Sequence, residues 1–389
     1  MFLTFPNFNL YSTPLLILVI QGLIFAFLLL RRYFTQKYVA DLLLCLLLLI
    51  TAYHRTTYTI GFMDWYDTFR NTKVNYYLVN LGLAVGPLIY LYVKSLVVPN
   101  FKFKKVHLWH FLPAVLTIVY DAVILVHDMQ QPGFDEVQNG PWYLKYNMEL
   151  LPQLFYGLYY TSYLLYFAFT IQLFYNYKKK IEQFFSNTYK VELNWIRNFL
   201  IIYIFLTAYG YAQDILSLFM EIGYKERWWV NLFSAIAVVY LGVKGYFTDL
   251  SSLYKLTFNF SPDTIVENEV EEDFTDEKQR ITSYFETEKP YLNPDLTLPE
   301  MGKLLKMGTN ELSQVINSGF QMNFNDFVNT YRVEEVKSSM IDPKNGHLSL
   351  LAIAYDSGFN SKATFNRVFK KLTGVSPSQY LTQHKVETS

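Results

Sequence analysis

Long apolar stretches separated by short polar segments dominate the first 250 residues of the chain. Each stretch holds about the 20 residues that a helix needs to cross roughly 30 Å of hydrocarbon. One such stretch would also fit a buried helix of a large soluble core, but seven in series favour a membrane. The pattern therefore predicts an all-α protein that begins with a seven-helix transmembrane bundle in residues 1–249. The predicted spans are 11–30, 38–60, 74–98, 106–127, 151–175, 195–222 and 228–247.

The apolar pattern ends after this region. Residues 250–276 include most of an acidic run, from Asp263 to Glu277, that has eight carboxylates and no basic residue. We interpret this segment as a cytoplasmic linker, because a run of like charge repels itself and stays solvated and extended. Residues 277–389 then change to short amphipathic helices, which are typical of a soluble domain.

The soluble segment contains an internal repeat. Met307 matches Phe359 and Thr309 matches Ser361, each pair 52 residues apart. After one inserted residue the spacing becomes 53, and the apolar positions of the two copies continue to match. A repeat of this kind predicts two structural copies of one motif.

Each copy has the pattern of a helix, a tight turn and a second helix. The copies occupy residues 297–318 and 349–372, and this is the spacing of a helix-turn-helix. Thr297 and Glu300 form the sequence signature of a capping box at the start of the first copy. A helix at 324–341 is predicted to join the copies and to hold them about one turn of DNA apart.

The basic residues of the connecting loops predict an orientation. The loops after the first, third and fifth spans carry 11 lysines and arginines, whereas the alternate loops, with Arg55 counted among them, carry 6. Lysine and arginine accumulate on the cytoplasmic side, so the richer loops are expected to be cytoplasmic. Seven spans then place the N-terminus outside and the C-terminal domain inside, in the inner membrane of a bacterium.

The composition of the chain is consistent with this division into an apolar region, an acidic linker and a soluble domain. The chain is 52% hydrophobic and 17% charged, with a formal net charge of zero that averages an apolar region, an acidic segment and a mixed domain. Cys45 is the only cysteine, which excludes an intrachain disulfide and a thiolate zinc cluster. The spans carry no motif for nucleophilic catalysis, zinc binding or phosphate binding. We therefore expect no enzyme activity, no metal and no cofactor.

The second copy carries a resemblance to a known family. The stretch "IAYDSGFNSKATFNRVFKKLTGVSPSQY" resembles the double helix-turn-helix domain of the AraC family, and the likeness extends over roughly residues 277–383. The pair Gly358-Phe359, together with Gly374, belongs to its specific pattern. The chain departs from the family at Gly302 and Val336, where alanine is usual.

A further resemblance concerns the membrane part. The stretches "LGLAVGPLIYLYVKSL" and "HFLPAVL" are similar to the membrane module of AraC-type regulators that place several spans before the DNA-binding domain. The resemblance implies a one-component transcription regulator whose membrane part senses an unknown ligand or membrane signal. Its implied partners are promoter DNA, the lipid bilayer, RNA polymerase and a second copy of the chain.

Helical spacing predicts which side chains face DNA. Turning Leu312, Val315 and Ile316 inward exposes amides in the first copy. Turning Phe365, Val368 and Phe369 inward exposes cations in the second, and Leu372 is expected on the same inward face. Amides can pair with adenine, whereas cations suit guanine or phosphate. An isolated basic helix is more often a solvated face, but a repeated helix-turn-helix favours DNA. The predicted residues are Asn310, Ser313, Gln314, Asn317, Lys362, Ala363, Thr364, Asn366, Arg367, Lys370 and Lys371.

Ionisable and polar residues inside the predicted spans are candidates for the sensor. Charge in hydrocarbon is costly, so Asp121 and Asp214, which lie near the middle of their predicted spans, invite a functional explanation. For each of them singly, a hydrogen bond between helices is at least as good an explanation as a ligand contact. The candidate sensor cavity consists of Asp121, Tyr209, Gln213 and Asp214.

A different class of function stays open. A transporter or membrane enzyme with a DNA-binding regulatory tail would share these features. A transporter should show paired broken helices at matching places in two halves of the chain. Gly86-Pro87 is the one such break in the sequence, so the regulator is the better interpretation.

Overall fold

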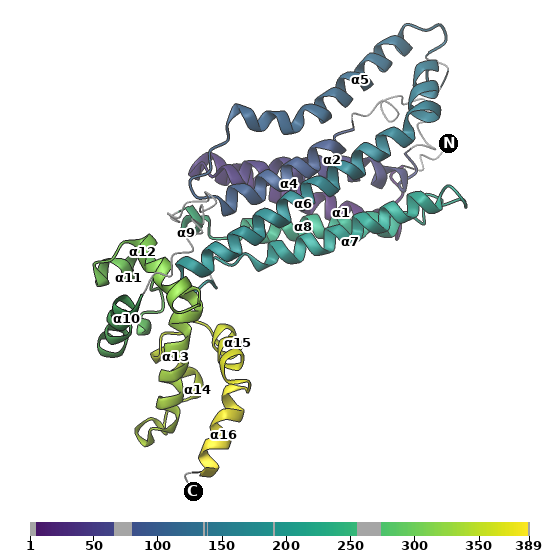
Figure 1. Cartoon of the computed structure of the whole chain (residues 1–389). Helices are drawn as coiled ribbons and strands as arrows, with labels where there is room; N and C mark the ends of the chain where they lie inside the picture. The colour runs from purple at the N-terminus through teal and green to yellow at the C-terminus, as the bar shows by residue number, and fades with distance from the viewer. Residues whose placement is uncertain are drawn as a thin grey trace. The chain divides into compact units, whose positions relative to one another are not determined.

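The computed structural model describes residues 5–65, 80–134, 137, 139–189, 191–254 and 274–387. Within these ranges the chain is helical, and its β-structure is one isolated bridge between Phe185 and Thr297. The chain divides into two compact units (Figure 1). The first comprises Met1–Phe174 with Asn194–Thr257, and the second comprises Tyr175–Leu193 with Phe258–Ser389.

The first unit is a set of apolar helices in which α2 packs against α1, α4 and α8. Many large apolar side chains on the outer helices are exposed, among them Val115, Val119 and Val123 on α5. Water would penalise such surfaces, whereas lipid would not. The elements are α1 (Ser12–Gln36), α2 (Val39–Gly61), α4 (Gly82–Val97), η2 (Lys105–Phe111), α5 (Leu112–Met129), η3 (Tyr143–Leu150), α6 (Pro152–Phe184), α7 (Asn194–Leu216), α8 (Trp228–Tyr246) and α9 (Leu250–Tyr254).

Five helices in the described part of the chain are long and apolar enough to cross a membrane, two fewer than the seven predicted. They are Ser12–Gln36, Val39–Gly61, Lys105–Met129, Asn194–Leu216 and Trp228–Tyr246. Helix α4, at the predicted third span, has 16 residues, and the first part of that prediction lies outside the described residues. Helix α6, at the predicted fifth span, has 33 residues but is rich in tyrosine and ends in a charged segment.

The second unit contains short amphipathic helices around one long helix. Its elements in the described residues, besides the end of α6, are α10 (Thr275–Glu288), η4 (Pro290–Leu292), α11 (Leu298–Leu305), α12 (Thr309–Gln314), η5 (Val315–Gly319), α13 (Phe324–Ile341), η6 (Pro343–Asn345), α14 (Leu350–Asp356), α15 (Lys362–Thr373) and α16 (Pro377–Glu387). Helix α13 covers the same residues as the predicted joining helix. Of the predicted linker, residues 255–273 lie outside the described ranges.

Helix α13 contributes side chains to two separate hydrophobic cores. Phe324, Phe327 and Val328 at its start pack with α10, α11 and α12. Val336 and Met340 near its end pack with α14 and α15. Two small cores on one rigid helix fix the spacing of the two helix-turn-helix copies, because neither core can turn without repacking against α13.

The two copies have matching backbone hydrogen bonds at the start of each turn. Met307 N donates to Gly302 O at 2.8 Å, and Phe359 N donates to Ala354 O at 3.0 Å. The two donors are 52 residues apart and so are the two acceptors, as the sequence alignment predicts. Gly302 replaces the usual alanine where the turn is tight, since a Cβ there would lie 3.0 Å from Met307 O.

Side-chain caps begin the helices of both copies. Thr297 Oγ1 accepts from Glu300 N at 3.4 Å and Glu300 Oε2 accepts from Thr297 N at 3.0 Å, which is the predicted capping box. The second helices begin after Gly308 and Ser361, which are 53 residues apart. The inserted residue therefore enters before Ser361, and the predicted match of Thr309 with Ser361 is wrong by one position.

Candidate DNA-binding site

The second helix of the first copy presents neutral polar side chains. Asn310, Gln314 and Asn317 are exposed, whereas Ser313 is half-buried and its hydroxyl accepts a hydrogen bond from Asn317 Nδ2 at 3.1 Å. Helix α12 ends at Gln314 and continues as the π-helical turn η5. The wider turn changes the direction of Asn317 from the one that a regular α-helix would give.

The second helix of the second copy, α15, presents cations. Lys362, Ala363, Asn366, Arg367, Lys370 and Lys371 are exposed. Thr364 is half-buried, and its hydroxyl accepts a hydrogen bond from Ser361 Oγ at 2.9 Å, so it takes part in the cap of the helix. The expectation that Leu372 faces inward with Phe365 is wrong, because Leu372 is 42% exposed.

Two of these cations already face carboxylates of the same unit. Lys371 Nζ lies 2.7 Å from Asp326 Oδ1, at the start of α13. Arg367 lies 3.8 Å from Glu192 Oε1, which belongs to the connection between α6 and α7. Lys362 and Lys370 form no ion pair with any described residue, so their charges are directed to solvent. Helix α15 thus carries two kinds of cation: Arg367 and Lys371 lie near carboxylates, whereas Lys362 and Lys370 pair with no described residue.

A buried arginine, which the sequence analysis did not single out, lies between the two copies. Arg332 on α13 is 1% exposed and donates to Tyr291 O at 2.8 Å and to Asn293 O at 2.7 Å. It also donates to Ser186 O at 3.1 Å and to Ser186 Oγ at 3.0 Å. Burial lowers the pKa of Arg332 to about 10, which leaves it charged at neutral pH.

The sequence carried a signal for this residue. Arg332 lies four positions after Val328 and four before Val336, and both valines are fully buried. Positions four apart share a helix face, so a buried charge was implied there. A buried guanidinium needs oxygen acceptors. The acceptors come from distant parts of the chain, which no local pattern reveals.

Asp214 has a charged partner in the first unit. It forms an ion pair with Arg227 and accepts a hydrogen bond from the hydroxyl of Tyr160. Helix α7 ends at Leu216, so Asp214 lies in its last turn, and the prediction of a mid-span position is wrong. A carboxylate at a helix end and beside an arginine costs much less than an isolated one in hydrocarbon.

The other sensor candidates divide between two places. Gln213 Nε2 donates to Tyr209 Oη at 3.3 Å and to Glu226 O at 3.1 Å. Its Oε1 is buried and accepts no hydrogen bond from the described residues. Asp121 lies apart from them on α5, beside Asn147. The structure therefore groups Tyr209, Gln213 and Asp214 but does not bring Asp121 to them.

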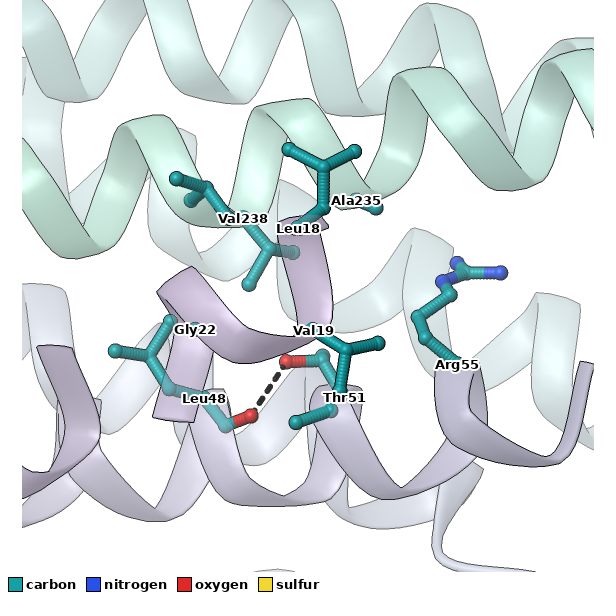
Figure 2. Close-up of a pocket in the computed structure, with 10 residues that line it drawn as sticks. Leu18, Val19, Gly22, Leu48, Thr51, Arg55, Ala235 and Val238 are labelled. Carbon is teal, nitrogen blue, oxygen red and sulfur yellow. Dashed lines mark hydrogen bonds between the residues drawn. The ribbon is translucent and has the colours of Figure 1, made fainter. Parts of the chain in front are cut away.

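Arg55 is not a loop residue, contrary to its place in the orientation argument. It lies within α2 and its guanidinium donates to Asn231 Oδ1 and Ser234 Oγ of α8. Figure 2 shows it at one end of an apolar hollow lined by Val19 and Leu48 among others. The hollow has a volume of about 20 Å³, close to the space of one water molecule, and is too small for a sensed ligand.

Comparisons with known proteins agree with the helical geometry of the second unit. Residues 301–383 match a helix-turn-helix domain family. This match supports the predicted AraC-type domain for that part of the chain. No solved structure matches the chain.

Similar proteins include uncharacterized HTH-type transcriptional regulators of Staphylococcus aureus strains COL, N315 and MRSA252. Each is 30% identical over 105 residues, which is 27% of this chain and 13% of the relative. The likeness is thus confined to a small part of each relative. It says nothing of the apolar helices.

Proposed function

We propose that this protein is a membrane-embedded transcription regulator that binds promoter DNA through its two helix-turn-helix copies. The observation that carries the proposal is the pair of copies on α13, each with an exposed polar second helix. The family match and the regulator names of the similar proteins support it. In α15 the cations Lys362, Arg367 and Lys370 are exposed, which leaves them accessible to the phosphates of DNA.

The membrane arrangement has support from the second unit. That unit contains both the α6–α7 connection and the C-terminal domain, so we propose that both lie on the same side of a membrane. Two apolar helices, α7 and α8, lie between them in the chain, and two crossings return it to the same side. The basic residues Lys178, Lys179 and Lys180 in the last part of α6, just before this connection, favour the cytoplasm. Seven spans, with α4 and α6 included, would place the N-terminus outside.

The sensor part of the proposal rests on the end of α7. The Asp214–Arg227 pair adjoins Gln213, whose buried Oε1 accepts no hydrogen bond from the described residues, and polar groups of this kind mark functional sites in membrane helices. We place the response to a ligand or membrane signal there. RNA polymerase and a second copy of the chain are the further partners of a regulator of this kind. No cofactor is proposed.

The DNA-binding proposal is tested with the full chain in lipid nanodiscs. The protein is incubated with sheared genomic DNA, and retained fragments are sequenced. We expect a few enriched fragments, and their loss in Arg367→Gln/Lys370→Gln. The control Lys289→Gln/Lys344→Gln removes the same charge from exposed residues outside α12 and α15. Retention of random fragments by the wild type, unchanged in both variants, would show that these helices do not recognise promoter sequence.

The topology is tested with single cysteines in a Cys45→Ser background. Gln130→Cys should react with an impermeant thiol reagent in intact cells, and Tyr189→Cys should react only after the cells are opened. Tyr189 is 59% exposed, so a cysteine there is accessible from its own side. Labelling of position 189 in intact cells would place the second unit outside the cell.

The sensor is tested with Asp214→Asn, which keeps size but removes the charge facing Arg227. We expect altered expression of the genes next to the enriched fragments, with the amount of protein unchanged. Glu221→Gln is the control, because Glu221 is an exposed carboxylate beyond the end of α7. Equal expression in both variants and the wild type would make Asp214 a structural residue.

A further inference from the structure

The connection between α6 and α7 is built into the DNA-binding unit. Ser186 is 1% exposed and its backbone is fully engaged: Ser186 N donates to Leu296 O at 3.1 Å. Ser186 O accepts from Asn325 Nδ2 at 2.9 Å and from Arg332 Nη1 at 3.1 Å. Phe185 forms the isolated bridge with Thr297 next to it. A hydroxyl and two backbone groups of one loop residue thus bind α13 and the segment that precedes the first copy.

The loop is also ordered by its own contacts. Tyr177 is fully buried and its hydroxyl donates to Val191 O at 2.5 Å. Thr188 Oγ1 donates to Glu192 Oε1 at 2.6 Å, and Lys178 Nζ lies 3.7 Å from Glu192 Oε2. These contacts hold the Glu192 carboxylate in one place. Its position is therefore set by the loop together with the last part of α6.

That position is beside Arg367, one of the exposed cations of the second copy. The Glu192 carboxylate lies 3.8 Å from Arg367, whose side chain is 59% exposed. A phosphate group bound by Arg367 would approach the same guanidinium. The carboxylate neutralises part of the charge that attracts the phosphate and repels the phosphate itself.

We propose that the loop between α6 and α7 is a regulatory element that sets the DNA affinity of α15 through Glu192. The proposal rests on DNA binding by the two copies, as proposed above. Ser186 anchors the loop between the copies, and Glu192 competes with phosphate for Arg367. The two ends of the loop continue into α6 and α7. A displacement of one of these helices along the other therefore changes the separation of Glu192 and Arg367, which gives the membrane part a short covalent route to the DNA-reading surface.

A purely structural loop predicts something different. If the loop only completes the fold, removal of the Glu192 charge leaves DNA affinity unchanged as long as Ser186 stays in place. If the loop regulates, the variant binds DNA more tightly than the wild type. An increase in affinity is not what damage to the fold produces, so its sign separates the two cases.

The test uses the full chain in nanodiscs and a random-sequence duplex of about 30 base pairs, long enough for two major-groove contacts one turn apart. Fluorescence anisotropy gives Kd at low and high salt. We expect Glu192→Gln to bind about two- to five-fold more tightly, the range of one exposed ion pair. The gain should shrink as salt rises, because salt screens exposed charges.

Two further variants control the interpretation. Glu334→Gln removes one negative charge from α13 in the same unit, where the carboxylate pairs with Lys337 at 2.8 Å, and should leave the affinity unchanged. In Arg367→Gln the second change Glu192→Gln should have no further effect, because the competing pair is already gone. An equal gain in Glu334→Gln, or a gain that persists without Arg367, would reduce the effect to bulk charge and overturn the proposal.

The remaining outcomes are distinguishable. If the wild type binds the duplex and Glu192→Gln binds it equally, the regulatory role of the loop is wrong while DNA binding stands. If neither protein binds the duplex at any salt concentration, the proposed DNA-binding function fails, and the regulatory role fails with it. If only Glu192→Gln binds, the loop is an inhibitor in the resting state and the proposal is supported in its strongest form.

Discussion

The two helix-turn-helix copies share the backbone of their first helices and the start of their turns, and differ in their surfaces. Their turns have the same hydrogen bonds, and their first helices begin at capping residues 52 positions apart, Thr297 and Ser349. Their second helices, however, expose amides in α12 and η5 and cations in α15. Packing against α13 restrains the first helices and the turns, which match between the copies. The exposed faces of the second helices are not restrained in this way, so their residues can differ. We therefore expect the two copies to contribute differently to DNA binding, the first through base contacts and the second through phosphate contacts.

The turns show how the surroundings of one position determine its residue. Both turns contain a residue in the left-handed region, Lys306 with φ 53° and Gly358 with φ 89°. Lys306 is exposed, so its side chain has room. A Cβ at Gly358 would lie 2.3 Å from Tyr291 O and 3.0 Å from Arg332 Nε. Only the turn beside the buried arginine therefore requires glycine.

The largest expected effect comes from Gly358→Ala. The left-handed backbone and the clash with Tyr291 O together should destabilise the second copy by about 3 kcal/mol. Hydrogen exchange of the full chain should show faster exchange in α14 and α15 than in α11. Gly346→Ala is the control, since Gly346 has no positive φ and its added Cβ would lie 3.3 Å from Pro343 O. Equal exchange in both variants would contradict the tight approach.

Gln314→Ala tests the first copy as a reader of bases. An amide that pairs with one base should contribute discrimination of about 1–3 kcal/mol at that base pair. We expect Kd values for single-base variants of an enriched fragment to converge at one position. The dependence of Kd on salt should stay unchanged, because no charge is removed. A uniform loss of affinity across all fragments would assign Gln314 to the backbone of DNA instead.

Lys370→Ala tests the second copy as a binder of phosphate. Removal of one phosphate contact should weaken binding to every duplex and lower the slope of log Kd against log salt by about one unit. Titrations of the full chain at several salt concentrations measure it. Lys344→Ala serves as the control. An unchanged slope with altered sequence preference would make Lys370 a reader of guanine.

The smallest expected effect comes from Lys306→Gly. Relief of the left-handed lysine gains about 1 kcal/mol, and the greater freedom of glycine in the unfolded chain removes about half of it. We expect the first copy to become more stable by about 0.5 kcal/mol in the same exchange measurement. A clear destabilisation would show that the Lys306 side chain makes contacts that glycine loses.

Local patterns were sufficient for much of the second unit. The 52-residue spacing, the Thr297–Glu300 capping box and the exposed face of α15 each depend on residues close together in the chain. Leu372 was assigned inward because it continues the spacing of Phe365, Val368 and Phe369, but the core of the second copy ends before it. Periodicity gives the direction of a side chain and not the extent of the surface that covers it.

Non-local features were missed for a physical reason. The basic segment 178–180 indicated a cytoplasmic loop, but nothing in it reveals that Ser186 fills the space beside Arg332, 146 positions away. The apolar pattern likewise counted the tyrosine-rich α6 with the other spans, although its aromatic hydroxyls make it less apolar. Contacts between distant segments depend on tertiary geometry, which cannot be inferred from the local pattern of a single sequence.

The position of Ser186 also limits how the protein can be taken apart and recombined. A contiguous cassette of residues 274–387, fused to a different protein, would carry the buried Arg332 without two of its four hydrogen bonds, and unpaired donors of a buried charge destabilise a fold. A working chimaera has to transfer the α6–α7 loop together with the domain. The exchangeable module of this protein is therefore two separate stretches of chain, and a donor and an acceptor must be matched at both.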